Sequence, residues 1–245
     1  MSEEANSDEF IYGIHPVLEA VQAGKELQKV LINPEAKSPQ INELLGVLRK
    51  QNIRHQFVPT QKLNKLVKGN HQGVIAYVSL VESVDLYDFL NLELAKGTTL
   101  RILALDHITD VRNIGALARS ALAFGFHAIL VPEKGSVLIH SGAIKSSAGA
   151  LLKIPLIQVA SLTAALKDIR LHGISIVGIT ESGNKELKYI PKDDHLTLVL
   201  GSEETGIRKE HLALCRDTYR IPQGENIGSL NVSVAGAVAM YELVR

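Results

Sequence analysis

Near its C-terminus the chain reads IPQGENIGSLNVSVAGAVAMYELVR (residues 221–245), a polar segment followed at once by an apolar one. Ser229 and Asn231 carry side chains that donate and accept hydrogen bonds. The residues that follow lack the polar face that a surface helix keeps for water. We therefore expect a closing helix that is covered on nearly every side. Its polar first residues are expected to have a functional role. The simpler alternative is that Ser229 or Asn231 only caps the helix.

A second group of candidate residues lies in LDHITDVRNIGALARSALAFG (residues 105–125), where an expected strand leads through a polar loop into a helix. Asn113 suits the start of that helix as an N-cap. Arg119 is the only charge among the Ala and Leu residues that follow, which is an unusual place for a plain surface charge. A structural ion pair of Arg119 with Asp106 or Asp110 remains the alternative.

A third group lies in LVLGSEETGIRKE (residues 198–210). Gly201 follows a buried strand, and a glycine there lets a ligand approach the backbone closely. Glu203 and Glu204 suit the start of a helix, where the helix dipole favours carboxylates. Each of the three groups is a weak indication when it is taken alone.

The sequence lacks the motifs of several common classes of enzyme and cofactor-binding domain. The 19 glycines form no G-x-G pair, which excludes the glycine-rich loop of dinucleotide-binding domains. The segment GSEETG has the glycine spacing of a phosphate-binding loop but lacks the Lys-Ser/Thr that follows one, and no G-x-S-x-G motif is present. No metal-ligand spacing of His and Cys occurs. Cys215, the only cysteine, is interpreted as a small core residue.

The elements that must position these residues fall into two halves. Apolar spacing in the first half predicts an alternation of helices and strands, with helices at 11–24, 41–52 and 61–69 and strands at 27–34, 53–60 and 73–80. We expect a disordered tail over residues 1–8, a compact α/β domain over 9–81, and a linker over 82–99 that holds one or two helical turns.

The second half, residues 100–245, alternates again. Its predicted strands are 101–107, 127–133, 155–160, 174–180, 195–202 and 218–222, and its predicted helices include 113–125, 141–152, 161–173 and the closing one. Because the strands are apolar and rich in β-branched residues, they indicate a parallel sheet that is buried on both faces. Ligands of such α/β domains bind at the carboxyl ends of the strands, where all three groups of candidate residues lie.

Charge is balanced over the whole chain, with 26 basic and 26 acidic residues, but it is unevenly distributed. No Asp or Glu occurs from Leu44 to Val81, a stretch that contains Arg49, Lys50, Arg54, Lys62, Lys65 and Lys68 together with His55 and His71. Such a local excess favours an anionic partner such as RNA or DNA, and a solvated surface is the alternative. An acidic N-terminus and the lack of an 18-residue apolar run predict a soluble, cytoplasmic protein without membrane contact.

Taken together, NIGALARS, LVLGSEETGI and IPQGENIGSLNVSVAGAVAMYE resemble, in this order and spacing, the three motifs of the SPOUT-class TrmH family of RNA ribose 2′-O-methyltransferases. The resemblance is greatest to the branch that methylates a guanosine of 23S ribosomal RNA. IYGIHPVLEAV and HQGVIAYVS resemble the N-terminal substrate-binding domain of that branch, a ribosomal-protein-like RNA-binding module.

The resemblance implies a SPOUT domain with a parallel sheet and a deep trefoil knot at its C-terminus, one of the rare exceptions to unknotted chains. It also implies that S-adenosylmethionine is held largely by main-chain groups around Gly201, Ser202, Ile221 and Leu230. Members of the family are homodimers whose sites are completed across the subunit interface. The polar start of the closing helix would then line the cofactor site, and its apolar part would pack in the knot and the interface.

In that family the catalytic arginine corresponds to Arg119, which the resemblance places against RNA bound on the partner subunit. We favour an electrostatic role over a general base, because a guanidinium hardly deprotonates in proteins. Asn113, Ser229 and Asn231 match the other polar site residues of the family, and Glu203 is a weaker candidate.

Other functions remain open at this point. A tRNA could replace ribosomal RNA as the substrate, since the nucleotide cannot be read from the sequence. A non-catalytic RNA-binding protein is a second alternative. Such a protein would have no reason to keep Asn113, Arg119 and the Ser229-Leu230-Asn231 motif together. A small-molecule α/β enzyme is disfavoured by the missing nucleotide-binding motifs.

Overall fold

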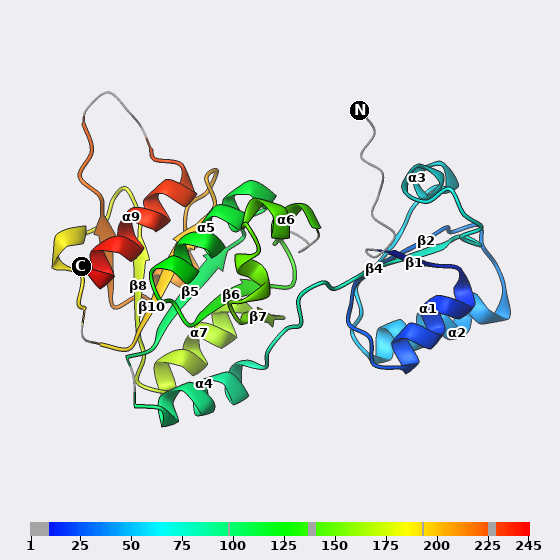
Figure 1. Ribbon diagram of the computed structural model, residues 1–245, viewed down its shortest axis with the longest axis horizontal. Helices are drawn as coiled ribbons and strands as arrows, with labels where there is room; N and C mark the ends of the chain where they lie inside the picture. Colours follow the sequence, from blue (N-terminus) through cyan, green and yellow to red (C-terminus); the bar gives the residue numbers. More distant parts are fainter. Residues whose placement is uncertain (1–9, 98, 137–140, 193, 225–228) are drawn as a thin grey trace. The chain divides into compact units, whose positions relative to one another are not determined.

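A computed structural model of the protein describes residues 10–97, 99–136, 141–192, 194–224 and 229–245. The chain forms two compact units, residues 1–82 and 83–245, shown in Figure 1. The predicted tail, residues 1–8, lies outside the described residues. Among the residues that are described, none of the helices has the length and apolar character that crossing a bilayer requires.

The first unit is a four-stranded sheet covered by helices on both faces. Its strands have the order β1-β4-β2-β3, in which β2 and β3 are parallel and the other neighbours are antiparallel. The elements are β1 (Phe10–Tyr12), α1 (Ile14–Gln22), β2 (Leu27–Ile32), α2 (Pro39–Lys50), β3 (His55–Phe57), α3 (Thr60–Leu66) and β4 (Val74–Val78).

The side chains of β2 point alternately to the two faces of the sheet, and each face has its own apolar core. Val30 and Ile32 pack with the apolar residues of α1 and α2, which lie side by side on one face (Figure 1). Leu31 points to the opposite face and packs with Leu63 of α3. Because successive side chains of a strand point to opposite faces, a strand covered on both sides is apolar along its whole length.

The second unit contains a seven-stranded parallel sheet in the order β7-β6-β5-β10-β8-β11-β9. The strands are β5 (Arg101–Asp106), β6 (Ala128–Pro132), β7 (Leu156–Val159), β8 (Ser175–Ile179), β9 (Lys185–Glu186), β10 (Leu196–Gly201) and β11 (Asp217–Arg220). The predicted α/β class and the parallel sheet of the C-terminal domain are confirmed. β10 lies at the centre between β5 and β8, so the ends of these three strands meet.

Helices cover both faces of this sheet. On one face α5 (Val111–Ala123) packs against α6 (Ser141–Ser146) and α9 (Val232–Val244), as Figure 1 shows. On the other face lie α4 (Leu86–Ala95), α7 (Leu162–Leu171) and α8 (Lys209–Leu212). Short 3₁₀ turns occupy Ala150–Leu152 and Leu187–Tyr189. Whether the C-terminal segment passes through a knot stays a prediction.

The segment predicted as a linker, residues 82–99, contains the three-turn helix α4. Asp85 caps this helix by accepting hydrogen bonds from the backbone N–H groups of Tyr87 and Asp88. Phe89 and Leu90 are buried in the core of the second unit, so the helix belongs to that domain. The prediction of a linker with one or two turns was wrong here, because the two buried residues are too few to give a clear apolar period.

The helix predicted over residues 141–152 is interrupted. It ends at Ser146, and Ala148 and Gly149 adopt left-handed backbone conformations before the 3₁₀ turn begins. A left-handed residue cannot continue a right-handed helix. The break lets Ser146 approach α5 at Gly115, where an added β-carbon would lie 1.9 Å from the Ser146 hydroxyl oxygen.

Candidate active site

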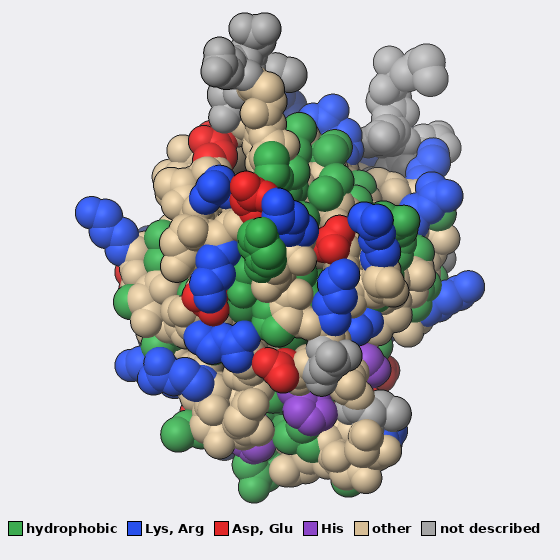
Figure 2. Space-filling model, turned by 90° about the vertical axis from the view of Figure 1, so that its left-hand side faces the viewer, with side chains coloured by type: hydrophobic (Ala, Val, Ile, Leu, Met, Phe, Trp, Pro, Cys, Tyr) green, Lys and Arg blue, Asp and Glu red, His purple; other side chains and the backbone are tan. Residues whose placement is uncertain are grey.

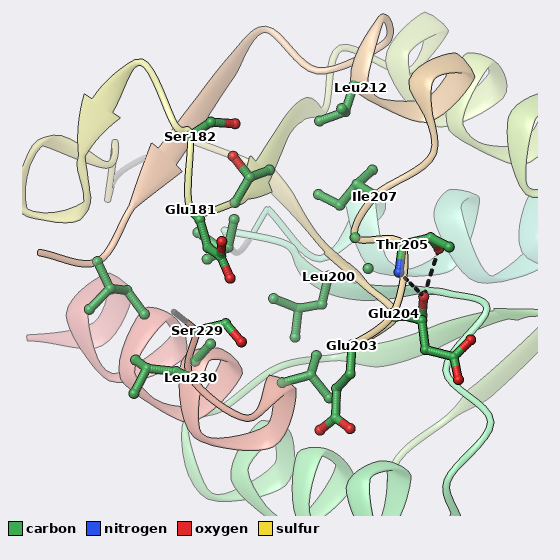
Figure 3. Close-up of a pocket in the computed structure, with 18 of the residues that line it drawn as sticks. Glu181, Ser182, Leu200, Glu203, Glu204, Thr205, Ile207, Leu212, Ser229 and Leu230 are labelled. Carbon is green, nitrogen blue, oxygen red and sulfur yellow. Dashed lines mark hydrogen bonds between the residues drawn. The ribbon is translucent and has the colours of Figure 1, made fainter. Parts of the chain in front are cut away.

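A cavity of about 430 Å³ opens at the carboxyl ends of β8 and β10. Residues of the second and third motif segments line it, and Asn113 of the first is hydrogen-bonded to Glu203 in its wall. The four residues predicted to bind a cofactor, Gly201, Ser202, Ile221 and Leu230, line this cavity, and so do Glu203 and Ser229. Figure 3 shows Ser229 and Leu230 at the start of α9 opposite the loop that carries Glu203 and Thr205.

The loop after β10 folds back on the end of the strand. Ser202 and Gly206 form an antiparallel bridge, and the Ser202 hydroxyl accepts a hydrogen bond from the Thr205 backbone N–H. An added β-carbon at Gly201 would lie 2.0 Å from the carbonyl carbon of Gly206 and 2.1 Å from the Ile207 nitrogen. The expectation that Gly201 leaves room for a ligand therefore needs correcting in part, since the chain's own backbone takes the space beside its α-carbon.

Asn113, Glu203 and Asn231 form one hydrogen-bonded cluster at the rim of the cavity. The Asn113 side-chain amide donates to Glu203 Oε1 at 3.1 Å. The Asn231 amide donates to Asn113 Oδ1 at 3.1 Å and also to Glu203 Oε1. Residues that are 118 positions apart in the sequence are thus joined around one carboxylate. The cluster holds the loop after β10 against the first turns of α5 and α9.

The two asparagines differ in their relation to helix ends. Asn231 is the N-cap of α9, where its Oδ1 accepts from the backbone N–H groups of Ser233 and Val234. It therefore acts both as a cap and as a member of the cluster. Asn113 is not a cap, because α5 begins two residues earlier and Asp110 caps it. Its side chain is free to face Glu203 instead.

Arg119 lies on the exposed side of α5. The described part of the chain gives it no hydrogen bond and no ion pair, and the two proposed structural partners are engaged elsewhere. Asp110 pairs with Arg112 at 2.8 Å, and Asp106 binds His107 and His211. Arg119 and Arg112 are seven residues apart, which places them on the same side of the helix. Arg119 does not line the cavity of its own chain.

A buried ionic group at the end of β5 was not identified from the sequence. The Asp106 side chain is 0% exposed and accepts hydrogen bonds from the Arg208 backbone N–H at 2.8 Å, His211 Nδ1 at 2.7 Å and His107 Nδ1 at 2.6 Å. Burial opposes ionisation of this carboxyl, but the three hydrogen bonds outweigh it and lower the pKa of Asp106. Asp106 thereby anchors the far end of the loop that begins at Gly201.

Replacement of Asp106 with Asn is expected to lower the free energy of unfolding by about 3 kcal/mol at pH 7, since an amide cannot accept all three hydrogen bonds. The pKa of Asp106 in the folded protein lies below its ordinary value of 3.8. The wild-type advantage is therefore complete above pH 3.8 and is lost as the pH falls through the lower, folded-state value.

Urea unfolding between pH 3 and pH 7 measures this difference. Asp168→Asn, on the exposed surface of α7, is the control and should change the free energy of unfolding by less than about 0.5 kcal/mol. A stability gap for Asp106→Asn that stays constant down to pH 3 would contradict an ionised Asp106 as the anchor.

The six basic residues predicted to bind RNA are all exposed on the first unit: Arg49, Lys50, Arg54, Lys62, Lys65 and Lys68. Burial lowers the pKa of Lys29, and the positive charges of Arg54 and Lys62 lower it further. Lys29 was not predicted, because it lies in β2 outside the stretch that lacks acidic residues. It also donates a hydrogen bond to Gln56 at 2.6 Å.

Cys215 behaves as the sequence suggested. It packs against the core of the second unit, its thiol donates to the His211 carbonyl oxygen at 3.4 Å, and burial raises its pKa to about 12. Within the described residues, no three His, Cys, Asp or Glu side chains are grouped so as to hold a metal ion.

The cavity lies at the carboxyl ends of parallel strands, which is where α/β domains bind their ligands. Comparisons with known proteins identify the class of the protein. Residues 100–241 match the model of the SpoU rRNA Methylase family, and residues 10–84 match that of the RNA 2'-O ribose methyltransferase substrate binding domain. The chain belongs to the SpoU family of RNA methyltransferases.

Individual proteins agree with this assignment. A protein of Staphylococcus aureus (strain COL) assigned to the TrmH family of tRNA/rRNA methyltransferases is 33% identical, over 97% of this chain and 96% of its own. The SpoU methyltransferase AviRb from Streptomyces viridochromogenes, solved in complex with the cofactor AdoMet, has a TM-score of 0.61 at 24% identity and covers 96% of this chain and 88% of its own. A structure of an RNA 2'-O ribose methyltransferase has a TM-score of 0.56 at 26% identity, covering 96% and 86%.

Proposed function

We propose that the protein transfers a methyl group from S-adenosylmethionine to a ribose 2′-hydroxyl of RNA, with a guanosine of 23S ribosomal RNA as the favoured substrate. The observation that supports this most is that two of the three motif segments line one cavity, while Asn113 of the third donates a hydrogen bond to Glu203 in its wall. Its volume of about 430 Å³ lies within the range of about 300–1,000 Å³ that is typical of cofactor sites. Gly201, Ile221 and Leu230, none of which has a polar side chain, line it, which fits a ligand held by main-chain hydrogen bonds.

When it is bound, the cofactor supplies a sulfonium methyl group that is already activated for transfer. The protein's task is to place the 2′-oxygen in line with that methyl group while the hydroxyl proton passes to solvent water. Alignment alone can contribute several kcal/mol, because it makes the encounter effectively unimolecular. Arg119 would bind the adjacent phosphate and stabilise negative charge developing on the 2′-oxygen. Asn113, Glu203 and Asn231 would hold the rim, with Ser229 facing the ribose.

The exposed position of Arg119 supports a homodimer. Val234, Val238 and Tyr241 form an exposed apolar stripe on α9, with exposed fractions of 48%, 39% and 52%. Tyr241 also contacts Phe124 at the end of α5, where Leu122 is exposed. Figure 2, which looks onto the side of the molecule where the C-terminus lies, shows hydrophobic side chains between Lys and Arg side chains. A second copy packed on this stripe would cover it and bring Arg119 to the partner's cavity.

Transfer of a labelled methyl group from S-adenosylmethionine to bulk ribosomal RNA and to bulk tRNA tests the proposed activity. Deleting the gene, mapping 2′-O-methyl marks on all RNAs and then restoring the gene identifies the nucleotide. A mark lost from 23S ribosomal RNA supports the proposal. A mark lost only from tRNA would mean that tRNA, and not ribosomal RNA, is the substrate. Unchanged RNA with no label incorporated would support a non-catalytic RNA-binding protein.

The basic residues of the first unit give a separate prediction. Replacing Lys62, Lys65 and Lys68 together with Ala should weaken RNA binding and reduce the magnitude of its salt slope by up to about 2, because fewer counterions are released. Filter binding at several salt concentrations measures both quantities. The control is the exposed basic set Lys153, Lys167 and Arg170 of the second unit, also changed to Ala. An equal salt slope for both triple variants would show that residues 62–68 are only solvated surface.

A further inference from the structure

The walls of the cavity carry a surplus of negative charge. Its described lining includes three carboxylates, Glu181, Glu203 and Glu204, and neither Lys nor Arg. Glu203 is held by the side-chain amides of Asn113 and Asn231, which are polar but uncharged. A ligand with a positive charge therefore enters a favourable potential.

Two guanidinium groups on neighbouring segments do not cancel this surplus. Arg112 forms a bidentate interaction with Asp110, which is the main cause that raises the pKa of Arg112, while Glu203 contributes less. Arg208 lies 3.9 Å from Asp106, whose other hydrogen-bond partners are His107 and His211. Both arginines are thus engaged by acids outside the cavity.

Glu181 differs from the other two acids of the cavity in the direction of its side chain. It follows β8, the strand next to β10, and among the described residues it has neither a hydrogen bond nor an ion pair. Figure 3 shows its carboxylate on the inner side of the loop after β8, directed toward Ser229. The carboxylates of Glu203 and Glu204 point away from the centre of the cavity in the same view. Glu181 is the carboxylate most available to a bound ligand.

We propose that Glu181 is a specificity-determining residue that makes this cavity favour the cationic methyl donor over the spent cofactor, and this inference rests on the proposed function. S-adenosylmethionine and S-adenosylhomocysteine share the adenosine, the ammonium and the carboxylate groups. They differ in the methyl group and in the positive charge on sulfur, which is present only in the donor. A nearby unpaired carboxylate therefore attracts the sulfonium and has no corresponding interaction with the neutral thioether.

This difference in charge favours release of the spent cofactor after each methyl transfer. Once the methyl group has left, the sulfur is neutral, and the attraction by Glu181 that held the donor is lost. The spent cofactor is then bound less tightly than fresh donor, so that exchange is favoured even when both are present. Salt should weaken this preference, because Glu181 is exposed at the cavity wall and its charge is screened.

Isothermal titration calorimetry of the full chain tests the proposal directly, with binding and not activity as the measurement. The ligands are S-adenosylmethionine, S-adenosylhomocysteine and sinefungin, in which an amine-bearing carbon replaces the methylated sulfur and restores a positive charge. In Glu181→Gln the affinity for the first and third ligands should fall about tenfold, and that for S-adenosylhomocysteine should change by less than about twofold.

Two further variants make the result interpretable. Glu210→Gln removes an exposed carboxylate of α8 that does not line the cavity, and it should leave all three affinities unchanged. Glu181→Asp keeps the charge and should retain most of the preference for the donor. Thermal unfolding of each variant confirms that it is folded, which is expected because residue 181 is exposed.

Several results would overturn the proposal. Equal losses for all three ligands in Glu181→Gln would mean that Glu181 binds a group they share, such as the ribose hydroxyls or the ammonium group. Unchanged affinities would mean that Glu181 does not interact with the ligand. If wild-type protein bound none of the three ligands, the proposed function itself would fail, which is a distinguishable outcome.

Discussion

Arg119→Ala is expected to reduce methyl transfer by about 10²–10³-fold while the dissociation constant of S-adenosylmethionine changes by less than about twofold. The guanidinium lies on the exposed side of α5, has no partner among the described residues of its own chain, and does not line the cavity. Its removal should therefore leave cofactor binding intact and take away only the positive charge that the RNA meets. Single-turnover assays and titration calorimetry measure the two quantities separately.

Arg112→Ala is the matched control, because Arg112 lies two turns earlier on the same side of the same helix and is bound to Asp110. Its effect on turnover should be no more than about threefold, in the range of a rim contact. If Arg119→Ala abolished cofactor binding in a folded protein, the assigned role would be wrong. Equal effects of the two substitutions would reduce Arg119 to a general contribution of positive charge.

Mixing subunits tests whether Arg119 serves the partner's cavity. A dimer that combines an Arg119→Ala subunit with a subunit whose cavity is inactivated contains one intact pair, formed by the cavity of the first and the arginine of the second. Random association of equal amounts should then restore about a quarter of wild-type activity, because half of the dimers are mixed and each has one working site. No restored activity would show that the arginine acts within its own chain.

Gly201→Ala is expected to weaken cofactor binding by more than about thirtyfold and to lower the free energy of unfolding by about 3 kcal/mol. An added methyl group would lie 2.0 Å and 2.1 Å from the backbone atoms of Gly206 and Ile207. Backbone cannot rotate away as a flexible side chain can, so the loop after β10 must move. The same loop carries Ser202 and Glu203, and its displacement would disturb both the cavity wall and the asparagine cluster.

Gly46→Ala provides the comparison for this substitution. Gly46 lies inside α2, an added β-carbon there would meet no atom within 4 Å, and its backbone is helical. Alanine at that position should stabilise the first unit by about 0.5–1 kcal/mol and leave cofactor binding unchanged. Urea unfolding and calorimetry are the measurements. Wild-type affinity in Gly201→Ala would mean that the loop tolerates displacement and that its backbone does not define the cofactor site.

Local patterns in the sequence predicted most of the strands and helices. The apolar, β-branched segments ending at Asp106 and Gly201 form neighbouring parallel strands, as their composition predicted. The short strand β1 was missed, because three residues are too few to show a period, and it exists through its antiparallel pairing with β4. The break after Ser146 was missed because the residues around it are small and compatible with a helix.

Sequence motifs identified most residues of the candidate site. The contacts between these residues could not be predicted from the sequence. Asp106 and His211 are 105 positions apart, and no local spacing indicates that they form a buried pair. Glu181 lies in a loop without a recognisable motif, and only its place beside the end of β10 brings it into the cavity. Arg119 was singled out by its place among Ala and Leu residues and its role was assigned by resemblance, whereas its lack of structural partners among the described residues required coordinates.

Asn231 has a consequence for motion in the folded protein. Its side-chain oxygen Oδ1 accepts from the backbone N–H groups of Ser233 and Val234, while its side-chain nitrogen Nδ2 donates to Asn113 and Glu203. Fraying of the first turn of α9 must therefore release the carboxylate cluster in the same event. In amide hydrogen exchange, those two N–H groups should share one opening free energy with the rim of the cavity, and a bound ligand should slow their exchange together.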